Sequence, residues 1–259
     1  KKEITFHTPM DTSRIVGGVE ATLGQFPYQI GLLASTPSGT GFCGGSILNE
    51  KWILTAAHCV DVATSVTILF AAQNIVNNNP EQFSLVASKI VVHSNWNPSA
   101  ITNDIALLEL PEAIMFQILD LVQPIRLPSR SQAKTTFAGL TGTVSGWGRD
   151  SDSATAVSPV LRYTSNPILT NLRCNLRWFG MVRDSQVCLS ADKGRSSCNG
   201  DSGGPLVVSD TDGETTQIGV VSFGSGLGCA SGWPGVYTRT SSYLEWIATN
   251  TGGSVVIRD

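Results

Sequence analysis

The sequence predicts an all-β protein in which short strands pack as a sandwich or a barrel, with one helix near the end of the chain. The first observation is a series of short apolar runs rich in β-branched residues. The second is that Gly and Pro residues separate these runs along the whole chain. The runs cover residues 52–55, 66–70, 90–92, 105–110, 142–147, 205–208, 218–223 and 236–238.

The predicted helix covers about residues 242–250. Ser242 and Glu245 have the spacing of a capping box, in which each side chain accepts from the other residue's backbone N–H. An apolar stripe at helical spacing is formed by Tyr243, Leu244, Ile247 and Ala248. Segment 122–130 contains two prolines and is expected to link two halves of the chain, whereas residues 251–259 are expected to form a loose tail.

Composition excludes several classes of protein. No run approaches the roughly 18 apolar residues that suggest a membrane-spanning helix. The net charge of −3 leaves no basic surface for a nucleic acid. Neither a membrane nor a nucleic acid is therefore expected as a partner, and the chain is expected to be a monomer.

Six cysteines, at positions 43, 59, 174, 188, 198 and 229, include no C-x-x-C pair. Structural zinc sites usually need that close spacing, so metal ligation is not favoured. Three disulfides formed in an oxidising compartment fit the even number better. Spacing alone does not choose among the pairings.

Three glycines surround Ser202 in the segment 200–205, Gly-Asp-Ser-Gly-Gly-Pro. Glycine permits unusual backbone dihedrals and lets a substrate approach the chain closely. A serine nucleophile needs a base that takes its proton, a group that orients the base, and N–H groups that face the oxygen becoming negative. The alternative interpretation, a surface turn that happens to contain a serine, is disfavoured by the full six-residue pattern.

His58 and Asp104 are the candidates for the base and the orienting group. His58 follows an apolar strand in Thr-Ala-Ala-His-Cys, and of the three histidines it is the only well-placed base. Asp104 directly precedes an apolar strand, and a buried carboxylate is costly unless it is paired. A histidine N–H would be such a partner. The alternatives are a structural core histidine and an ordinary aspartate at the start of a strand.

Five motifs occur in order across nearly the whole chain: Arg14 followed by Ile-Val-Gly-Gly, segments 55–59 and 103–108, Ser-Gly-Trp-Gly at 145–148, and segment 200–205. This set resembles the trypsin and chymotrypsin family of serine proteases, and within it the arthropod chymotrypsins and collagenolytic serine proteases. The resemblance implies two packed six-stranded antiparallel β-barrels, at about 15–122 and 131–240, before the C-terminal helix. Residues 1–14 would be an activation propeptide.

The resemblance also implies residue roles. His58, Asp104 and Ser202 would form a catalytic triad, and the amides of Gly200 and Ser202 the oxyanion hole. Ser222 would lie near Asp104 and help to hold the substrate backbone. The implied disulfides are Cys43–Cys59, Cys174–Cys188 and Cys198–Cys229, the last of which would brace the specificity pocket.

The floor of the S1 specificity pocket, six residues before the nucleophile in this family, is Ser196 here. Gly224 and Gly235 would be its walls and would leave the slot open. Because serine carries no charge, a cationic substrate side chain would lose its solvation without gaining a partner. Cleavage after Phe, Tyr, Leu, Trp or Met is therefore expected, and Lys193 and Arg195 are interpreted as solvated loop charges.

Arg14 and Ile15 form a junction that resembles the activation site of the family. A trypsin-like protease would cut it, because an uncharged pocket should not accept Arg14. The new α-amine of Ile15, with a reference pKa of about 7.7–8.0, would pair with Asp201 and draw segment 200–202 into its active shape. In the uncut chain, Asp201 is expected to face solvent or another donor, with a malformed oxyanion hole.

Two departures from the family pattern matter. Some relatives bind calcium with two acidic residues in a loop that corresponds to residues 71–81, where only Glu81 is acidic. No metal site is therefore expected, and no cofactor. Gly41 stands where some zymogens carry a histidine that holds the aspartate next to the nucleophile.

The sequence as a whole predicts the precursor of a secreted, extracellular serine endopeptidase, such as one of a digestive tract lumen. Its expected partners are protein or peptide substrates, an activating trypsin-like protease and protein protease inhibitors. One alternative is a collagenolytic protease of broad specificity. Another is an inactive homologue that acts as a binding protein, which the three retained triad residues disfavour.

Overall fold

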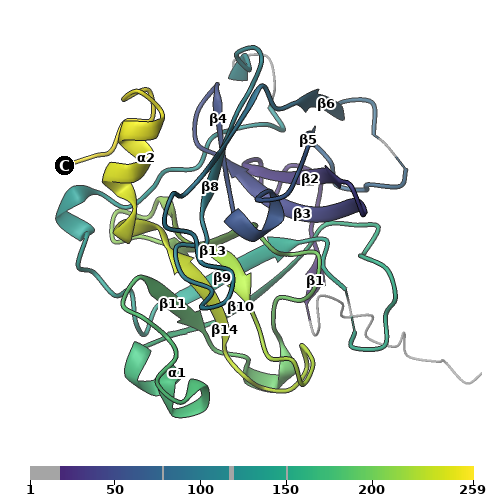
Figure 1. Cartoon of the computed structure of the whole chain (residues 1–259). Coiled ribbons are helices and arrows are strands. Elements are labelled where there is room, and N and C mark those ends of the chain that lie inside the picture. The colour runs from purple at the N-terminus through teal and green to yellow at the C-terminus, as the bar shows by residue number, and fades with distance from the viewer. Residues whose placement is uncertain (1–17, 78, 117–119, 150) are drawn as a thin grey trace, which may run out of the picture.

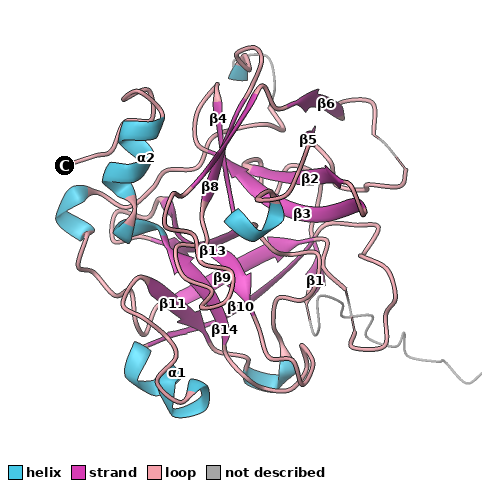
Figure 2. Ribbon diagram, viewed as in Figure 1, coloured by secondary structure: helices cyan, strands magenta, loops and turns pink. Residues whose placement is uncertain are grey.

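The computed structural model describes residues 18–77, 79–116, 120–149 and 151–259. Its strands form two antiparallel sheets, which lie one above the other in Figure 1. Figure 2 shows that the strands make up the body of the molecule, whereas the two α-helices lie at its periphery. The prediction of an all-β fold with two barrels is therefore confirmed. The predicted propeptide, residues 1–14, lies outside the described residues.

The first sheet contains seven strands in the order β6-β5-β2-β3-β4-β8-β7. They are β2 (Gln29–Thr36), β3 (Gly39–Ile47), β4 (Trp52–Thr55), β5 (Ser65–Phe70), β6 (Phe83–Val86), β7 (Lys89–Val92) and β8 (Ala106–Glu109). β6 and β7 are neighbours in sequence but lie at opposite ends of this order. Between them, Ala87 N–H donates to the carbonyl of Val66 (2.9 Å) and Ser88 N–H to that of Glu109 (2.8 Å). One bent segment thus closes the sheet into a barrel, which has six strands when that segment is counted once.

The second sheet has the order β1-β10-β11-β14-β13-β12-β9, and an additional pairing of β10 with β9 closes it. Its strands are β1 (Val19–Glu20), β9 (Thr141–Gly146), β10 (Arg162–Leu169), β11 (Gln186–Leu189), β12 (Pro205–Ser209), β13 (Thr215–Phe223) and β14 (Gly235–Arg239). The two-residue β1 is an addition to β10, so the closed part again has six strands. Each of the eight apolar runs contributes a strand, whereas β1, β2, β3, β6, β10 and β11 were not predicted.

Buried polar side chains join the two barrels. Ser145 in β9 donates its hydroxyl to Gln29 Oε1 in β2 at 2.7 Å, and Ser46 in β3 donates to Gln217 Oε1 in β13 at 2.7 Å. All four residues are at most 4% exposed. Because a buried hydrogen bond is costly to leave unmade, these pairs fix how one barrel sits on the other.

The described chain contains two α-helices, α1 (Asn171–Trp178) and α2 (Leu244–Asn250). It also has short 3₁₀ turns: η1 (Ala57–Cys59), η3 (Arg130–Gln132), η4 (Asp192–Gly194) and η5 (Thr240–Ser242). The C-terminal helix is confirmed, but the capping box is wrong, since η5 occupies its place and no side chain caps α2. Helix α1 was not predicted; the hydroxyl of Thr170 caps it by accepting from Arg173 N–H at 3.2 Å. Neither helix is long and apolar enough to cross a membrane.

The expectation of a loose C-terminal tail is wrong. Val255 and Ile257 are each only 5% exposed and belong to the core of the first barrel. The guanidinium of Arg258 donates to the carbonyl of Leu127 at 3.1 Å. The last residues therefore pack beside the linker, segment 122–130. The linker touches both sheets, since Ile125 N–H donates to the carbonyl of Ile47 in β3 and residue 126 forms a bridge with residue 216 in β13.

Candidate active site

His58 and Asp104 are brought together by adjacent strands of the first barrel. His58 lies in η1 directly after β4, and Asp104 lies just before β8, which pairs with β4. The imidazole Nδ1 is 2.7 Å from Asp104 Oδ2, and the backbone N–H of His58 donates to Oδ1 at 2.9 Å. The side chain of Asp104 is 1% exposed and that of His58 31% exposed. The carboxylate is thus buried while the ring still reaches solvent.

The second barrel completes the surroundings of Asp104. Ser222 in β13 donates its hydroxyl to Asp104 Oδ2 at 2.5 Å, and Thr238 in β14 donates to the backbone carbonyl of Asp104 at 2.7 Å. The Ser222 hydroxyl offsets part of the cost of burying the carboxylate, and Thr238 fixes the backbone that carries it. A carboxylate that accepts at Nδ1 assigns the ring proton to that nitrogen, so Nε2 is left as the basic atom of His58.

Ser202 lies in the loop before β12, at the seam between the barrels. The next residue, Gly203, donates its N–H to the carbonyl of Val221 in β13 at 2.9 Å. On its other side, a Cβ at position 203 would lie 2.2 Å from Thr55 Oγ1, at the end of the strand that leads to His58. Ser202 is therefore held between the strand that carries the imidazole and the strand that carries Ser222.

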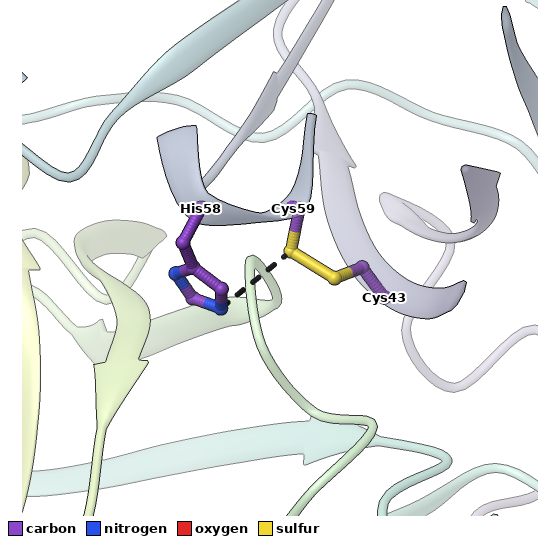
Figure 3. Close-up of side chains that lie close together, drawn as sticks. All are labelled: Cys43, His58 and Cys59. Carbon is purple, nitrogen blue, oxygen red and sulfur yellow. Dashed lines mark hydrogen bonds between the residues drawn. A yellow bond between two sulfur atoms is a disulfide. The ribbon is translucent and has the colours of Figure 1, made fainter. Parts of the chain in front are cut away.

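The hydroxyl of Ser202 makes no hydrogen bond with His58 in the part of the chain that the structure describes. Instead, Nε2 of His58 lies 3.8 Å from the sulfur of Cys59, beside the Cys43–Cys59 disulfide, as Figure 3 shows. Catalytic hydrogen bonds are often long before a substrate binds and shorten in the complex. The imidazole of His58 is thus oriented by Asp104, and we expect its hydrogen bond with the Ser202 hydroxyl to form when a substrate binds.

The candidate oxyanion hole depends on Gly200. Its φ is +104°, and a Cβ there would lie 2.6 Å from the side chain of Val157 and 3.1 Å from the Cα of Gly148. Only glycine fits such a backbone and such a contact. Among the described residues, the N–H groups of Gly200 and Ser202 have no acceptor, so both can donate to a ligand oxygen.

Asp201 does not face solvent, which corrects one of the two expected orientations. It is fully buried, and its carboxylate accepts from Gly148 N–H at 2.7 Å and from Cys198 N–H at 2.8 Å. The other expected orientation, toward another donor, agrees with these two amides. Burial raises the pKa of the Asp201 carboxyl from 3.8 to about 6, although the two N–H groups act in the opposite direction. No cation lies within ion-pair distance of it among the described residues, and Arg14 and Ile15 lie outside them.

A cavity of about 280 Å³ lies next to Ser202. Of the residues expected to form the S1 pocket, Ser196, Ser222 and Gly224 line it, and Ser196 is only 6% exposed. Aromatic rings contribute as well, through Phe223 and Trp233. Among the described residues, none that lines this cavity is charged. The cavity can therefore take an apolar side chain without leaving a charge unpaired.

Gly235 does not line the cavity, in contrast to the expectation. A Cβ there would lie 3.1 Å from the Tyr237 ring and 3.5 Å from the hydroxyl of Ser197, which is a lining residue. Gly235 thus lies behind the wall, between the ring of Tyr237 and the lining residue Ser197. Arg195 turns away from the cavity and donates to Asn166 Oδ1 at 2.9 Å.

The three disulfides implied by the resemblance are present: Cys43–Cys59, Cys174–Cys188 and Cys198–Cys229. Cys198 and Cys229 both line the cavity. This bridge therefore joins the segment before Ser202 to the opposite rim of the pocket.

Asp152 is a residue of the pocket rim that sequence reasoning missed. Its carboxylate accepts from Cys229 N–H at 2.6 Å and from Ala230 N–H at 3.3 Å. A Cβ on Gly228 would lie only 2.5 Å from Asp152 Oδ2, and Gly228 has a φ of +112°, so only glycine fits there. Gly228 and Cys229 line the cavity, so a side chain from a distant loop holds one rim of the pocket. Asp152 is one of two aspartates in the polar stretch 149–156, and nothing in that stretch signals this contact.

Two groups of residues have the arrangement of a metal site, namely Cys43 with His58 and Cys59, and Asp152 with Cys198 and Cys229. In both, the cysteines are paired in disulfides, so they offer no thiolates to a metal. The loop expected to lack calcium is tied by amides: Asn79 donates to the carbonyl of Ala71 at 2.7 Å.

Comparisons with known proteins agree with this geometry. Residues 15–247 match the Trypsin family. The chain is 40% identical to a protein named collagenase from Hypoderma lineatum, over 92% of this chain and 88% of that one. It is 39% identical to brachyurin from Leptuca pugilator, over 92% and 99% of the two chains. A solved structure of HL collagenase superposes with a TM-score of 0.82 at 40% identity, over 92% of this chain and 99% of that one. The chain therefore belongs to the trypsin family of serine proteases and is a serine endopeptidase.

Proposed function

We propose that the protein is a secreted endopeptidase, made as an inactive precursor, that cleaves polypeptides after large apolar residues with His58, Asp104 and Ser202 as its catalytic triad. The observation that carries this proposal is the buried Asp104 carboxylate at 2.7 Å from His58 Nδ1, next to the Ser202 loop and an uncharged cavity. Protein inhibitors of proteases and an activating protease are its proposed partners besides its substrates.

In the proposed reaction, Ser202 Oγ attacks the carbonyl carbon of the scissile bond while His58 Nε2 takes the hydroxyl proton. The carbonyl oxygen becomes negative and accepts from the N–H groups of Gly200 and Ser202. His58 then gives the proton to the leaving amine, and an acyl-enzyme remains. A water molecule then attacks the acyl carbon while His58 Nε2 takes its proton. The ester bond to Ser202 breaks, His58 returns the proton to Ser202 Oγ, and the acid product leaves. Asp104 holds the ring and stabilises its protonated form.

The roles of Ser202 and His58 can be tested by labelling and turnover. Ser202→Ala or His58→Ala should each lower kcat on a peptide amide by at least about a thousandfold, because the members of a triad act as a unit. Only Ser202→Ala also removes the attachment site, so it should abolish labelling by a fluorophosphonate. Ser209→Ala, at an exposed serine that ends β12 outside the candidate pocket, is the control and should keep both activities. Turnover or labelling that persists in Ser202→Ala would show that another residue is the nucleophile.

The preference for apolar side chains follows from the lining of the cavity. Ser196 at the proposed floor offers a hydroxyl, while Phe223 and Trp233 offer aromatic surface. An arginine or lysine side chain entering this cavity would leave water and meet no carboxylate among its described lining residues, and Asp152 at the rim already accepts from two backbone N–H groups. Transfer of a Phe or Leu side chain from water to such a site is favourable.

We expect kcat/KM for substrates with Phe or Leu before the scissile bond to exceed that for Arg or Lys by at least about tenfold. That ratio corresponds to only about 1.4 kcal/mol, which an unpaired charge should exceed. A peptide library read by mass spectrometry, with Ser196→Asp as the variant that should gain cleavage after Arg and Lys, measures this directly. Equal rates after Arg and Phe in the unchanged enzyme would refute the assignment of the pocket.

Asp152 should affect substrate binding at the pocket rim. In Asp152→Ala the N–H groups of Cys229 and Ala230 lose their acceptor, so the rim loosens and KM for a short Phe amide should rise several-fold. Because Asp152 touches none of the triad residues, kcat should change less than KM. Asp152→Asn keeps an acceptor oxygen and should restore most of the affinity. A fall in kcat with unchanged KM would contradict this role.

Activation by cleavage after Arg14 is supported by the state of Asp201. Its carboxylate is fully buried and has two N–H donors but no cation among the described residues. Removing a charge from water is expensive unless it is paired. The α-amine of Ile15, released by a cut after Arg14, would supply that pair and hold segment 200–202. The pairing would raise the pKa of the amine, so the active form would be lost as pH rises through that raised value.

Cleavage should change how stability depends on pH. In the uncut chain, the raised pKa of Asp201 means that the folded state takes up a proton between about pH 6 and 4, so this group's contribution to stability rises as pH falls. The difference between the pKa of Asp201 in the folded chain and its ordinary value corresponds to about 3 kcal/mol of stability. In the cut chain the paired carboxylate stays ionised. The gain in stability on cleavage should therefore be larger at pH 7 than at pH 4. Denaturant unfolding of cut and uncut Ser202→Ala protein measures it, and a gain that is equal at both pH values would contradict the pairing.

A second candidate function is the cleavage of collagen. We propose it because the Hypoderma lineatum relative and the matching solved structure are both named collagenase. It requires the same triad and pocket but a triple-helical substrate. Digestion of native collagen below its melting temperature, compared with gelatin, distinguishes it from activity on unfolded chains alone.

A further inference from the structure

Helix α1 carries its apolar residues on both faces. Cys174 and Trp178 face inward, where the Cys174–Cys188 disulfide and the contacts of the indole hold the helix to the second barrel. Leu172 and Leu176 each lie two positions earlier, which is about 200° around an α-helix. They therefore point outward and are 78% and 75% exposed. Figure 1 shows α1 projecting at the end of the second barrel, next to β11.

The exposed leucines belong to a larger surface. Phe179, which ends the helix in a left-handed conformation, is 82% exposed, and Met181 is 61% exposed. We call the four residues Leu172, Leu176, Phe179 and Met181 the α1 patch. Single exposed apolar residues are normal, but four that cluster on one short segment mark a surface used for contact.

Arginines surround the α1 patch. Arg173, Arg177 and Arg183 are exposed, and their guanidinium groups have no acceptor among the residues the structure describes. Asp184 is the one acidic residue in segment 171–184. In a chain with a net charge of −3, this is a local excess of positive charge. The surface therefore suits a partner that offers apolar side chains together with carboxylates.

Aromatic contacts connect the α1 patch to the candidate S1 pocket. The ring of Phe179 lies 6.2 Å from that of Trp233, which lines the pocket. Trp178 packs edge-on against both Trp233 and Phe223, each at 5.2 Å, and donates its indole N–H to the carbonyl of Pro234 at 3.0 Å. The patch is thus fixed to the pocket wall by the side chains that shape the wall.

From this continuity we propose that the α1 patch is an accessory docking surface for the polypeptide substrate, and that it binds a segment carrying apolar and acidic side chains outside the residue held in the pocket. The inference rests on the proposed function of the pocket. A second copy of the chain fits less well, because a two-fold contact through this patch would bring the arginines of both copies together. A lipid surface would not require the connection to the pocket.

The test compares substrates of different length on the active enzyme, with the active sites counted by a fluorophosphonate. The short substrate is a three-residue amide with Phe before the scissile bond. Longer ones carry the same three residues with a ten-residue arm on one side or the other, either Leu/Glu-rich or Ser/Lys-rich. For at least one side, the Leu/Glu arm should raise kcat/KM at least about fivefold over the Ser/Lys arm.

The combined variant Leu172→Ser, Leu176→Ser, Met181→Ser should lose this gain while cleaving the short amide at the original rate, because none of these three side chains packs on a ring of the pocket wall. Arg173→Gln with Arg177→Gln should weaken both the gain and its dependence on salt concentration. The matched control is Val76→Ser with Val256→Ser, which removes apolar residues that are 70% and 81% exposed elsewhere. It should leave every rate unchanged.

The outcomes separate this inference from the proposed function. If no variant or arm matters while the short amide is still cleaved, the docking surface is refuted and the protease function stands. If the short amide is not cleaved at all, the proposed pocket is wrong. Sedimentation of the unchanged protein as a dimer that the triple serine variant abolishes, without any effect of the arms, would assign the α1 patch to self-association and also refute the proposal.

Discussion

The buried carboxylate of Asp104 is the interaction on which the rest of the site depends. It accepts from the ring and the backbone of His58 in the first barrel and from Ser222 in the second, while Thr238 holds its carbonyl. A charge that is 1% exposed could not be retained if either barrel moved away. The need to satisfy one anion therefore holds the two barrels in register where the chemistry takes place.

A second buried carboxylate, Asp201, shows the contrast. Asp104 accepts from a ring N–H, a backbone N–H and a hydroxyl, whereas Asp201 has only two backbone amides as donors among the described residues. Burial raises the pKa of the Asp201 carboxyl, and the two amides oppose that rise only in part. Two carboxylates of similar burial thus have different donors: side chains from both barrels surround Asp104, whereas the backbone alone holds Asp201 among the described residues.

Much of the fold and the site could be predicted from local patterns. β4 and β8 are short runs of apolar residues, and the motifs around His58, Asp104 and Ser202 lie at their ends or in a glycine-rich loop, where sequence alone is informative. β3 was missed because its glycines, needed for the close approach of other segments, give it no β pattern. Helix α1 was missed because apolar residues occupy both of its faces. The role of Asp152 and the packing of the tail depend on contacts between distant segments. Segment 251–259 also has too few apolar residues to predict that it is buried.

The bend between β6 and β7 has a consequence for a protein that handles unfolded chains. Because the bent segment of β6 and β7 pairs with both β5 and β8, the described strands of the first barrel leave no free edge, and those of the second end only in the two-residue β1. Extended polypeptides readily add to open edges, which leads to aggregation. An extended polypeptide finds almost no such edge among the described strands. Closure of the barrels thus keeps the enzyme from becoming a template for the chains it cuts.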